Sequence, residues 1–220
     1  MKGASGSIGS RSWILYERLS GAVILGGVPA VLLLILSPVT VSKGELFEIS
    51  IKNSYLVPVA CTTILVINFF ATRKASNRNG YPLFRAEVWS ASTLLFNQST
   101  WAVYLFAYEF LFRGVLLSAT FLLLGKPLAI LFNILIYALL HIHRGRKQVL
   151  YAVPFGGLLC WLVLATSTWI SAALIHISFA VSYEFFVIAY QEKWWRRKYS
   201  TPANQTTFLE NILHPTYETD

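Results

Sequence analysis

The stretch WAVYLFAYEFLFRGVLLSATFLLL, residues 101–124, is apolar apart from two charged side chains, Glu109 and Arg113. A helix needs about 20 predominantly apolar residues to cross the roughly 30 Å hydrocarbon layer of a membrane. Glu109 and Arg113 are four residues apart, so on a helix they lie one turn from each other on one face and can neutralise each other. The stretch therefore predicts a transmembrane helix that carries a buried ion pair.

The whole chain has the composition of a membrane protein. Of its 220 residues, 55% are hydrophobic and 13% are charged, whereas about one quarter of the residues in soluble domains are charged. We expect an all-α fold, a polytopic bundle of about six transmembrane helices. Its apolar runs lie at 19–38, 54–71, 101–124, 127–142, 149–165 and 169–190. Between the second and third spans we expect an interfacial helix at 84–96, ended by a break at the polar residues 97–100.

The basic residues alternate between the two sides of the predicted spans. Fourteen Lys and Arg fall in the N-terminus, the second and fourth loops and the C-terminus, whereas the other loops hold Lys43, Lys52 and Lys126. The positive-inside rule then places both termini in the cytoplasm. These charges also account for the net charge of +8, so we expect membrane lipids as partners and no nucleic acid. Residues 1–198 form one transmembrane domain in this interpretation, and residues 199–220 form a polar cytoplasmic tail.

Five ionisable side chains fall inside the predicted spans: Glu109, Arg113, His141, His176 and Glu184. Such groups are costly in a membrane, so they normally face the interior of a bundle and pair with one another. Helices three, four and six can bring one carboxylate and two imidazoles into a shared cavity. A trio of this kind can activate water for hydrolysis or bind a divalent metal such as zinc. No His-Glu-x-x-His motif occurs, so we expect no required cofactor. Taken alone, the pair of Glu109 and Arg113 is equally well explained as a packing clamp.

Three segments then resemble the ordered motifs of a known family. They are YEFLFRG (108–114), YALLH (137–141) and HISFA (176–180). These are similar to the Glu-Glu-x-x-x-Arg, Phe-x-x-x-His and His-x-x-x-Asn motifs of the CAAX protease and bacteriocin-processing family, also called Abi, over about residues 100–190. The resemblance implies an intramembrane endopeptidase that acts on membrane-anchored or prenylated peptides. In bacteria the substrates of this family are peptides or bacteriocin-related, and we expect a multi-pass protein of the bacterial cytoplasmic membrane.

The resemblance implies roles for individual residues. Glu109 and Arg113 occupy the second Glu slot and the Arg slot, and His141 and His176 occupy the two histidine slots. Tyr137 stands in place of the motif's Phe, which is a minor change.

Two departures from the family pattern concern the chemistry. The first Glu slot, which activates water in the family, holds Tyr108, and the final Asn slot, which helps to bind the oxyanion, holds Ala180. A phenol with an unperturbed pKa near ~10 is a poor general base, and an alanine methyl group donates no hydrogen bond.

Three readings of these departures remain open. In the first, which we favour, Glu109 acts as the base together with His141, while His176 and the Tyr108 hydroxyl contact the oxyanion. In the second, Glu184 supplies the missing carboxylate. In the third, catalysis is lost and the pocket binds hydrophobic or lipidated peptides in an immunity or regulatory role.

The topology is directly testable with reporter fusions. A green fluorescent protein fused to the C-terminus should fluoresce, because it stays in the cytoplasm, whereas an alkaline phosphatase at the same place should be inactive. A fusion truncated after Lys126 should show the opposite pattern. Phosphatase activity from the C-terminal fusion, without fluorescence, would show that the predicted orientation is wrong.

Overall fold

The structure of this chain is a computed structural model, which describes residues 11–36, 53–74, 80–84, 86 and 89–192. The predicted tail at 199–220 lies outside these residues. The first helical segment is continuous and consists of α1 (Arg11–Ala22), the π-helix η1 (Val23–Gly27) and α2 (Val28–Leu36). Helix α3 (Leu56–Ala71) is separate. A second continuous segment consists of α4 (Ala91–Glu109), the π-helix η4 (Phe110–Leu116) and α5 (Leu117–Leu124). The others are α6 (Lys126–Leu139), the short 3-10 helix η5 (Ile142–Arg144), α7 (Arg146–Thr166) and α8 (Ile170–Gln191).

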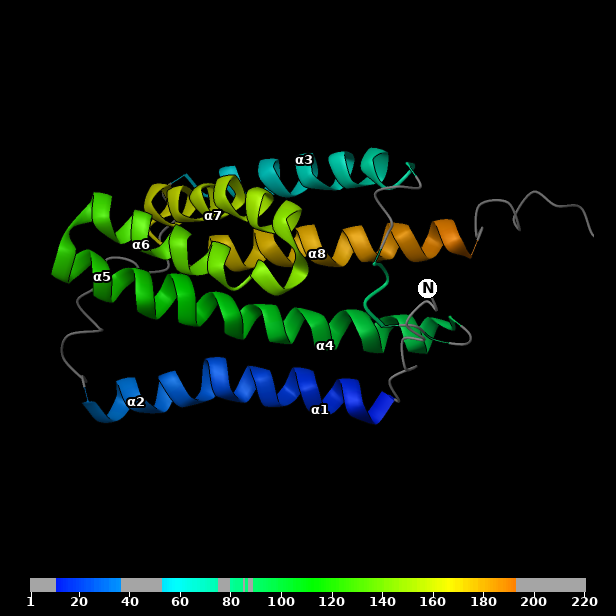
Figure 1. Ribbon diagram of the computed structural model, residues 1–220, viewed down its shortest axis with the longest axis horizontal. Helices are drawn as coiled ribbons and strands as arrows, with labels where there is room; N and C mark the ends of the chain where they lie inside the picture. The colour runs from blue at the N-terminus through cyan, green and yellow to red at the C-terminus, as the bar shows by residue number, and fades with distance from the viewer. Residues whose placement is uncertain (1–10, 37–52, 75–79, 85, 87–88, 193–220) are drawn as a thin grey trace, which may run out of the picture.

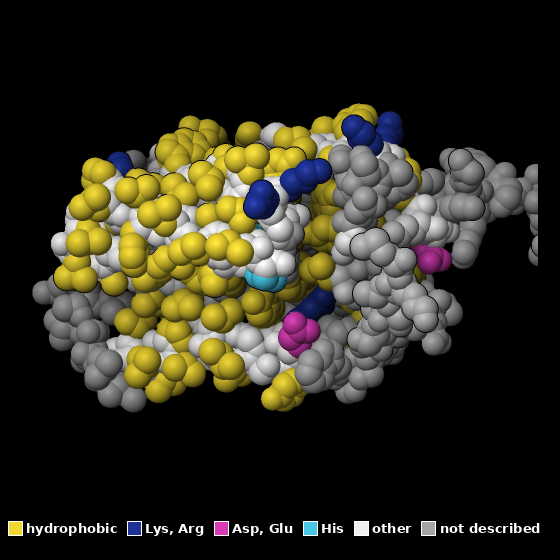
Figure 2. Space-filling model, in the orientation of Figure 1, with side chains coloured by type: hydrophobic (Ala, Val, Ile, Leu, Met, Phe, Trp, Pro, Cys, Tyr) yellow, Lys and Arg dark blue, Asp and Glu magenta, His cyan; other side chains and the backbone are white. Residues whose placement is uncertain are grey.

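These helices confirm the predicted all-α membrane bundle. Within the described residues, four helical segments are long and apolar enough to cross a membrane: Tyr16–Leu33, Ala91–Leu124, Arg146–Thr166 and Ile170–Gln191. The two remaining segments, α3 and α6, are apolar but shorter, with 16 and 14 residues. The outer surface supports the same conclusion, since Figure 2 shows a face covered largely by hydrophobic side chains, with Lys and Arg gathered in a few patches.

The turns between the later helices follow from residues with special backbone conformations. Gly125, with φ +76°, separates α5 from α6, and Pro127 stands in the first turn of α6. Gly145, with φ +97°, precedes α7, and Ser167 ends α7 in the left-handed conformation. These short connections make α5 and α6, α6 and α7, and α7 and α8 direct neighbours.

The helices are arranged around α4 and α8. Helix α1 packs on α4, α4 packs on α8, and α3 packs on α8 from the other side. Figure 1 shows that the start of α1, the end of α3, the start of α4 and the end of α8 lie at the same end of the bundle. The turn between α6 and α7 lies part-way along the bundle in this view.

The predicted break at residues 97–100 is wrong. Helix α4 runs through these residues without interruption from Ala91 to Glu109. Two of their polar side chains find partners on neighbouring helices: Arg18 Nη1 donates to Asn97 Oδ1 at 3.0 Å and to Thr100 Oγ1 at 2.9 Å, and Asn97 Nδ2 donates to Glu184 Oε2 at 3.2 Å. Because Asn97 and Thr100 form hydrogen bonds with side chains from α1 and α8, the backbone has no need to leave the helix.

Two π-helices lie against each other in the middle of the bundle. One is η1 in the first span, and the other is η4, which directly follows Glu109. In η4 the Leu117 amide donates to the Phe112 carbonyl, five residues earlier. π-Helical turns are rare and often occur at functional sites. The one in η4 contains Arg113.

Close packing between the first span and α4 depends on glycine. A Cβ atom added to Gly26 would lie 2.9 Å from the Cβ of Ala107, which is closer than non-bonded carbon atoms approach. The neighbouring Gly27 has room, since a Cβ there meets only Val23 Cγ1 at 3.7 Å.

This difference gives a matched pair of variants. Gly26→Ala should lower the melting temperature in detergent by several degrees, because overpacking typically costs about 1–3 kcal/mol. Gly27→Ala should leave the melting temperature unchanged or slightly raise it. Equal effects of the two variants would contradict the described contact between η1 and α4.

Candidate active site

Glu109 is the last residue of α4, and its side chain is 0% exposed. Arg113 Nη1 donates to Oε1 at 3.1 Å and lies equally close to Oε2. His176 Nδ1 lies 2.5 Å from the same Oε1. A buried carboxylate is stable only when it is paired and hydrogen-bonded. The structure thus brings together the carboxylate, the guanidinium and one of the two histidines that the sequence singled out.

Arg113 is held by its surroundings as well as by Glu109. Its guanidinium lies 4.5 Å from the centre of the Tyr137 ring, a cation–π contact that suits a desolvated cation. Gly156 on α7 leaves the space for this arrangement, since a Cβ there would lie 3.0 Å from Tyr137 Cδ1 and 3.7 Å from Arg113 Nη2. The π-helix η4 and helices α6 and α7 therefore meet around one buried cation.

The tautomer of His176 follows from its partner. A carboxylate oxygen facing Arg113 acts as an acceptor, so Nδ1 of His176 carries the proton and donates it to Glu109. In the neutral imidazole the lone pair is then on Nε2. A carboxylate that holds an imidazole in this way orients it as a base, as in the Ser-His-Asp arrangement. Glu109 is consequently placed to act through His176.

His141 follows the end of α6 and is half-buried. Its Nδ1 lies 2.8 Å from the Tyr137 carbonyl, which can only accept, so this nitrogen also carries a proton. The neutral form again has its lone pair on Nε2. The Tyr137 ring contacts both imidazoles, with ring centres 4.6 Å from His141 and 6.2 Å from His176.

Tyr108 packs against the cluster that contains Glu109, Arg113, His176 and Tyr137. Its ring stacks on Phe112 at 4.4 Å and meets His176 and Tyr137 edge-on at about 6 Å. The residue is 8% exposed, and its hydroxyl is buried without a hydrogen-bond partner among the described residues. Ala180 lies one turn after His176 on α8, so its methyl group is on the same side of the helix as the imidazole.

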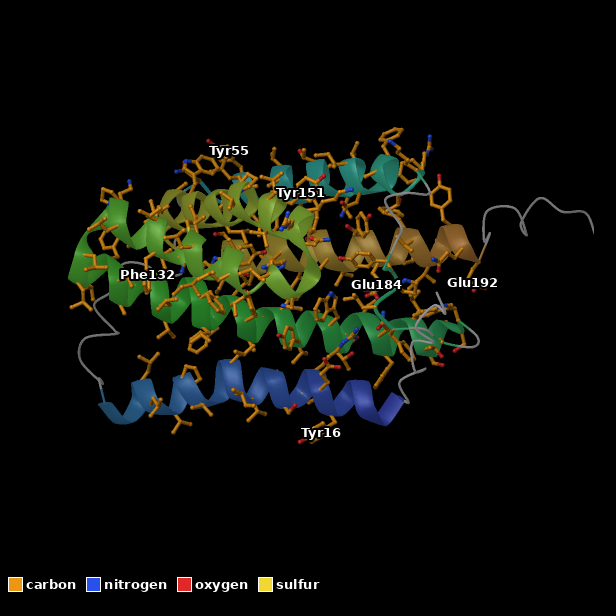
Figure 3. All side chains as sticks on the ribbon, in the orientation of Figure 1. Tyr16, Tyr55, Phe132, Tyr151, Glu184 and Glu192 are labelled. Atoms are coloured by element: carbon orange, nitrogen blue, oxygen red, sulfur yellow. The ribbon has the colours of Figure 1, made fainter. Side chains whose placement is uncertain are left out.

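Glu184 belongs to a different cluster. Its carboxylate accepts hydrogen bonds from the Leu83 amide at 2.8 Å and from Asn97 Nδ2 at 3.2 Å, and Asn97 in turn accepts from Arg18. Figure 3 shows Glu184 between α4 and α8, towards the end of the bundle at which α8 ends. The side chain is 0% exposed. These bonds direct Glu184 to the start of α4 and to the chain near Leu83, which weakens the reading in which it replaces the missing base.

Sequence reasoning missed two side chains that support the cluster. Asn133 on α6 is 0% exposed and donates from Nδ2 to the Phe112 carbonyl at 2.7 Å, inside the π-helix. Cys160 on α7 donates to Asn133 Oδ1 at 3.4 Å. The signal for Asn133 was present in the sequence as a single amide within an apolar span, which needs a polar partner in a membrane.

The arrangement holds the His176 imidazole against a buried carboxylate, and the Tyr137 ring contacts the His141 imidazole and the Tyr108 phenol. Groups of this kind can remove a proton from water and stabilise the oxyanion that forms when water attacks a carbonyl group. Among the described residues, no group of three His, Cys, Asp or Glu side chains is placed to hold a metal ion. A shallow groove lies elsewhere, on the outer face of α3 beside Pro58 and Thr62.

The ion pair makes a prediction about stability. Glu109→Gln should lower the free energy of unfolding by about 3–5 kcal/mol, since it leaves the Arg113 guanidinium buried without its counter-charge. The double variant Glu109→Gln/Arg113→Gln should recover part of this loss, because it removes both charges. Thermal unfolding in detergent, followed by circular dichroism, measures both effects. A double variant less stable than Glu109→Gln would contradict the role of Glu109 as the partner that neutralises Arg113.

Comparisons with known proteins give one match. Neither the curated proteins nor the solved structures contain a match to this chain. The family model for type II CAAX prenyl endopeptidase Rce1-like proteins matches residues 88–182, a range that includes Glu109, Arg113, His141 and His176. Residues 88–182 are therefore similar to the Rce1-like family of type II CAAX prenyl endopeptidases, as the three motifs predicted.

Proposed function

We propose that this protein is an intramembrane endopeptidase that hydrolyses a membrane-anchored or prenylated peptide near the cytoplasmic face of the membrane. The observation that carries the proposal is the hydrogen bond between Glu109 and His176, inside the segment that matches the Rce1-like family. A packing clamp needs only Glu109 and Arg113. The additional imidazole, with Nδ1 held and Nε2 basic, is the part that hydrolysis requires.

The proposed reaction follows from the roles of the side chains. His176 Nε2 takes a proton from a water molecule while the water oxygen bonds to the peptide carbonyl carbon, and the carbonyl oxygen becomes an oxyanion. The carbon–nitrogen bond then breaks, the departing nitrogen receives a proton from an imidazole, and the products are a carboxylic acid and an amine. Glu109 keeps His176 in the required tautomer, and Arg113 keeps Glu109 ionised within the membrane. His141 supplies the second imidazole, which holds the water or passes the proton on.

This assignment revises the expected role of Glu109. In the sequence-based reading Glu109 takes the proton from water itself. Arg113 and His176 both hold its carboxylate, and the side chain is 0% exposed. We therefore propose that Glu109 is a positioning residue and that the imidazoles contact the substrate.

A second function is favoured by a specific observation. Tyr108 and Ala180 occupy the family's slots for the water-activating acid and the oxyanion amide, and both side chains lie beside His176 in the described fold. A protein without these groups can still bind a hydrophobic or lipidated peptide and act as an immunity or regulatory factor. Peptide binding without cleavage distinguishes this pseudoprotease from the enzyme.

The test uses purified full-length protein in lipid vesicles. A fluorogenic peptide carrying a farnesyl group should be cleaved, and the same peptide without the lipid should be cleaved more slowly. His176→Gln should reduce kcat by at least about 100-fold, because general-base catalysis typically contributes about 10²–10⁴. His143→Gln is the matched control, since His143 is an exposed histidine two residues after His141, and it should retain full activity.

The same experiment separates the two proposals. If wild type binds the farnesylated peptide but cleaves neither it nor a panel of lipidated variants, the pseudoprotease replaces the enzyme. If His176→Gln cleaves as fast as wild type, the proposed base is wrong.

A further inference from the structure

We propose that the Tyr108 hydroxyl donates a hydrogen bond to the carbonyl oxygen of the bound peptide, and that it strengthens this bond as the oxyanion forms. The inference rests on the proposed function and develops the sequence-based reading that placed this hydroxyl at the oxyanion. The hydroxyl of Tyr108 is enclosed and has no hydrogen-bond partner within the described part of the chain. A buried hydroxyl without a partner costs free energy, so native proteins rarely keep one unless something else satisfies it.

The neighbouring atoms show which kind of group is missing. Arg113 Nε and Nη2 are also buried without a hydrogen-bond partner in the described residues, and Glu109 Oε2 is the one carboxylate atom in the same condition. Of these four buried atoms, three can donate a hydrogen bond and one can only accept. A ligand that completes it must bring acceptor oxygen, and a peptide carbonyl that gains negative charge is such a group.

Tyr108 is better placed than Arg113 to contact that oxygen. The guanidinium is 0% exposed and lies over the Tyr137 ring, whereas the Tyr108 ring meets His176 edge-on at 6.0 Å. Stacking on Phe112 at 4.4 Å holds the Tyr108 ring in place. A fixed donor near the proposed base suits an oxyanion contact, because it needs no reorganisation during the reaction.

The role is that of a donor and involves no proton transfer. The phenol keeps its proton throughout, as expected from a group whose unperturbed pKa is near ~10. Ala180, one turn after His176, offers only a methyl group. The Tyr108 hydroxyl on α4 thus supplies a hydrogen-bond donor beside His176, where Ala180 on α8 supplies none.

Tyr108→Phe tests the inference because it removes one oxygen atom and keeps the ring. With the farnesylated fluorogenic peptide, kcat should fall by about 10²-fold while KM changes little, since removal of one oxyanion donor typically costs about 10²–10³ in kcat. Ala180→Asn added to Tyr108→Phe should restore part of kcat, because an amide at that position lies one turn from His176. Tyr151→Phe is the control, since Tyr151 is 64% exposed on the outer face of α7.

Two readouts do not require cleavage. The melting temperature of Tyr108→Phe should equal or exceed that of wild type, because no hydrogen bond within the fold is lost. A farnesylated phosphinate peptide, which carries a tetrahedral anion, should bind wild type at least about tenfold more tightly than it binds Tyr108→Phe. The corresponding amide peptide should bind both proteins equally.

The possible outcomes distinguish a failure of this inference from a failure of the proposed function. A melting temperature several degrees below wild type, or unchanged kcat and phosphinate affinity, would overturn the inference and assign the hydroxyl a structural role. If wild type binds neither peptide and cleaves neither, the proposed function itself fails, and the inference fails with it. If wild type binds both but Tyr108→Phe behaves like wild type, the proposed function stands and the inference alone is wrong.

Discussion

The arrangement of the bundle depends on the bonds that the buried Glu109 carboxylate makes. A charge in the interior of a membrane protein is tolerated only when opposite charge and hydrogen-bond donors reach it. Here one partner comes from the next turn of the same helix, and the other, His176, comes from α8. The relative position of α4 and α8 is therefore set by a hydrogen bond as well as by apolar packing. The π-helix that follows Glu109 contains Arg113, and Asn133 from α6 donates to a carbonyl within it.

The two buried carboxylates of the later helices perform separate tasks. Glu109 pairs with Arg113 and His176 in the middle of the bundle, whereas Glu184 joins α8 to Asn97 and to the Leu83 amide. Because Asn97 also accepts a hydrogen bond from Arg18, the second cluster connects the first span to α4 and α8. This division leaves the Glu109 cluster as the proposed place of the chemistry, whereas the Glu184 cluster joins helices to one another.

Much of this was predictable from spacing and composition. The apolar runs located the spans to within a few residues at most ends, and the interval of four between Glu109 and Arg113 indicated their pairing. The error at residues 97–100 has a clear physical cause, since a polar run in an apolar helix is read as a break unless its partners are known. Those partners, Arg18 and Glu184, are far away in the sequence. The π-helix and the role of Gly156 depend on contacts between helices, which no local pattern encodes. The bond that fixes the tautomer of His176 was likewise visible only in three dimensions.

The central claim is that Glu109 holds the Nδ1 proton of His176. Nitrogen-15 NMR of protein labelled at histidine, in detergent micelles at neutral pH, measures this directly. The account predicts a protonated Nδ1 for His176 with a strongly deshielded proton, and loss of that signature in a folded Glu109→Gln variant while the His143 resonances stay unchanged. A His176 imidazole that carries its proton on Nε2 in wild type, or one whose resonances do not respond to Glu109→Gln, would contradict the account.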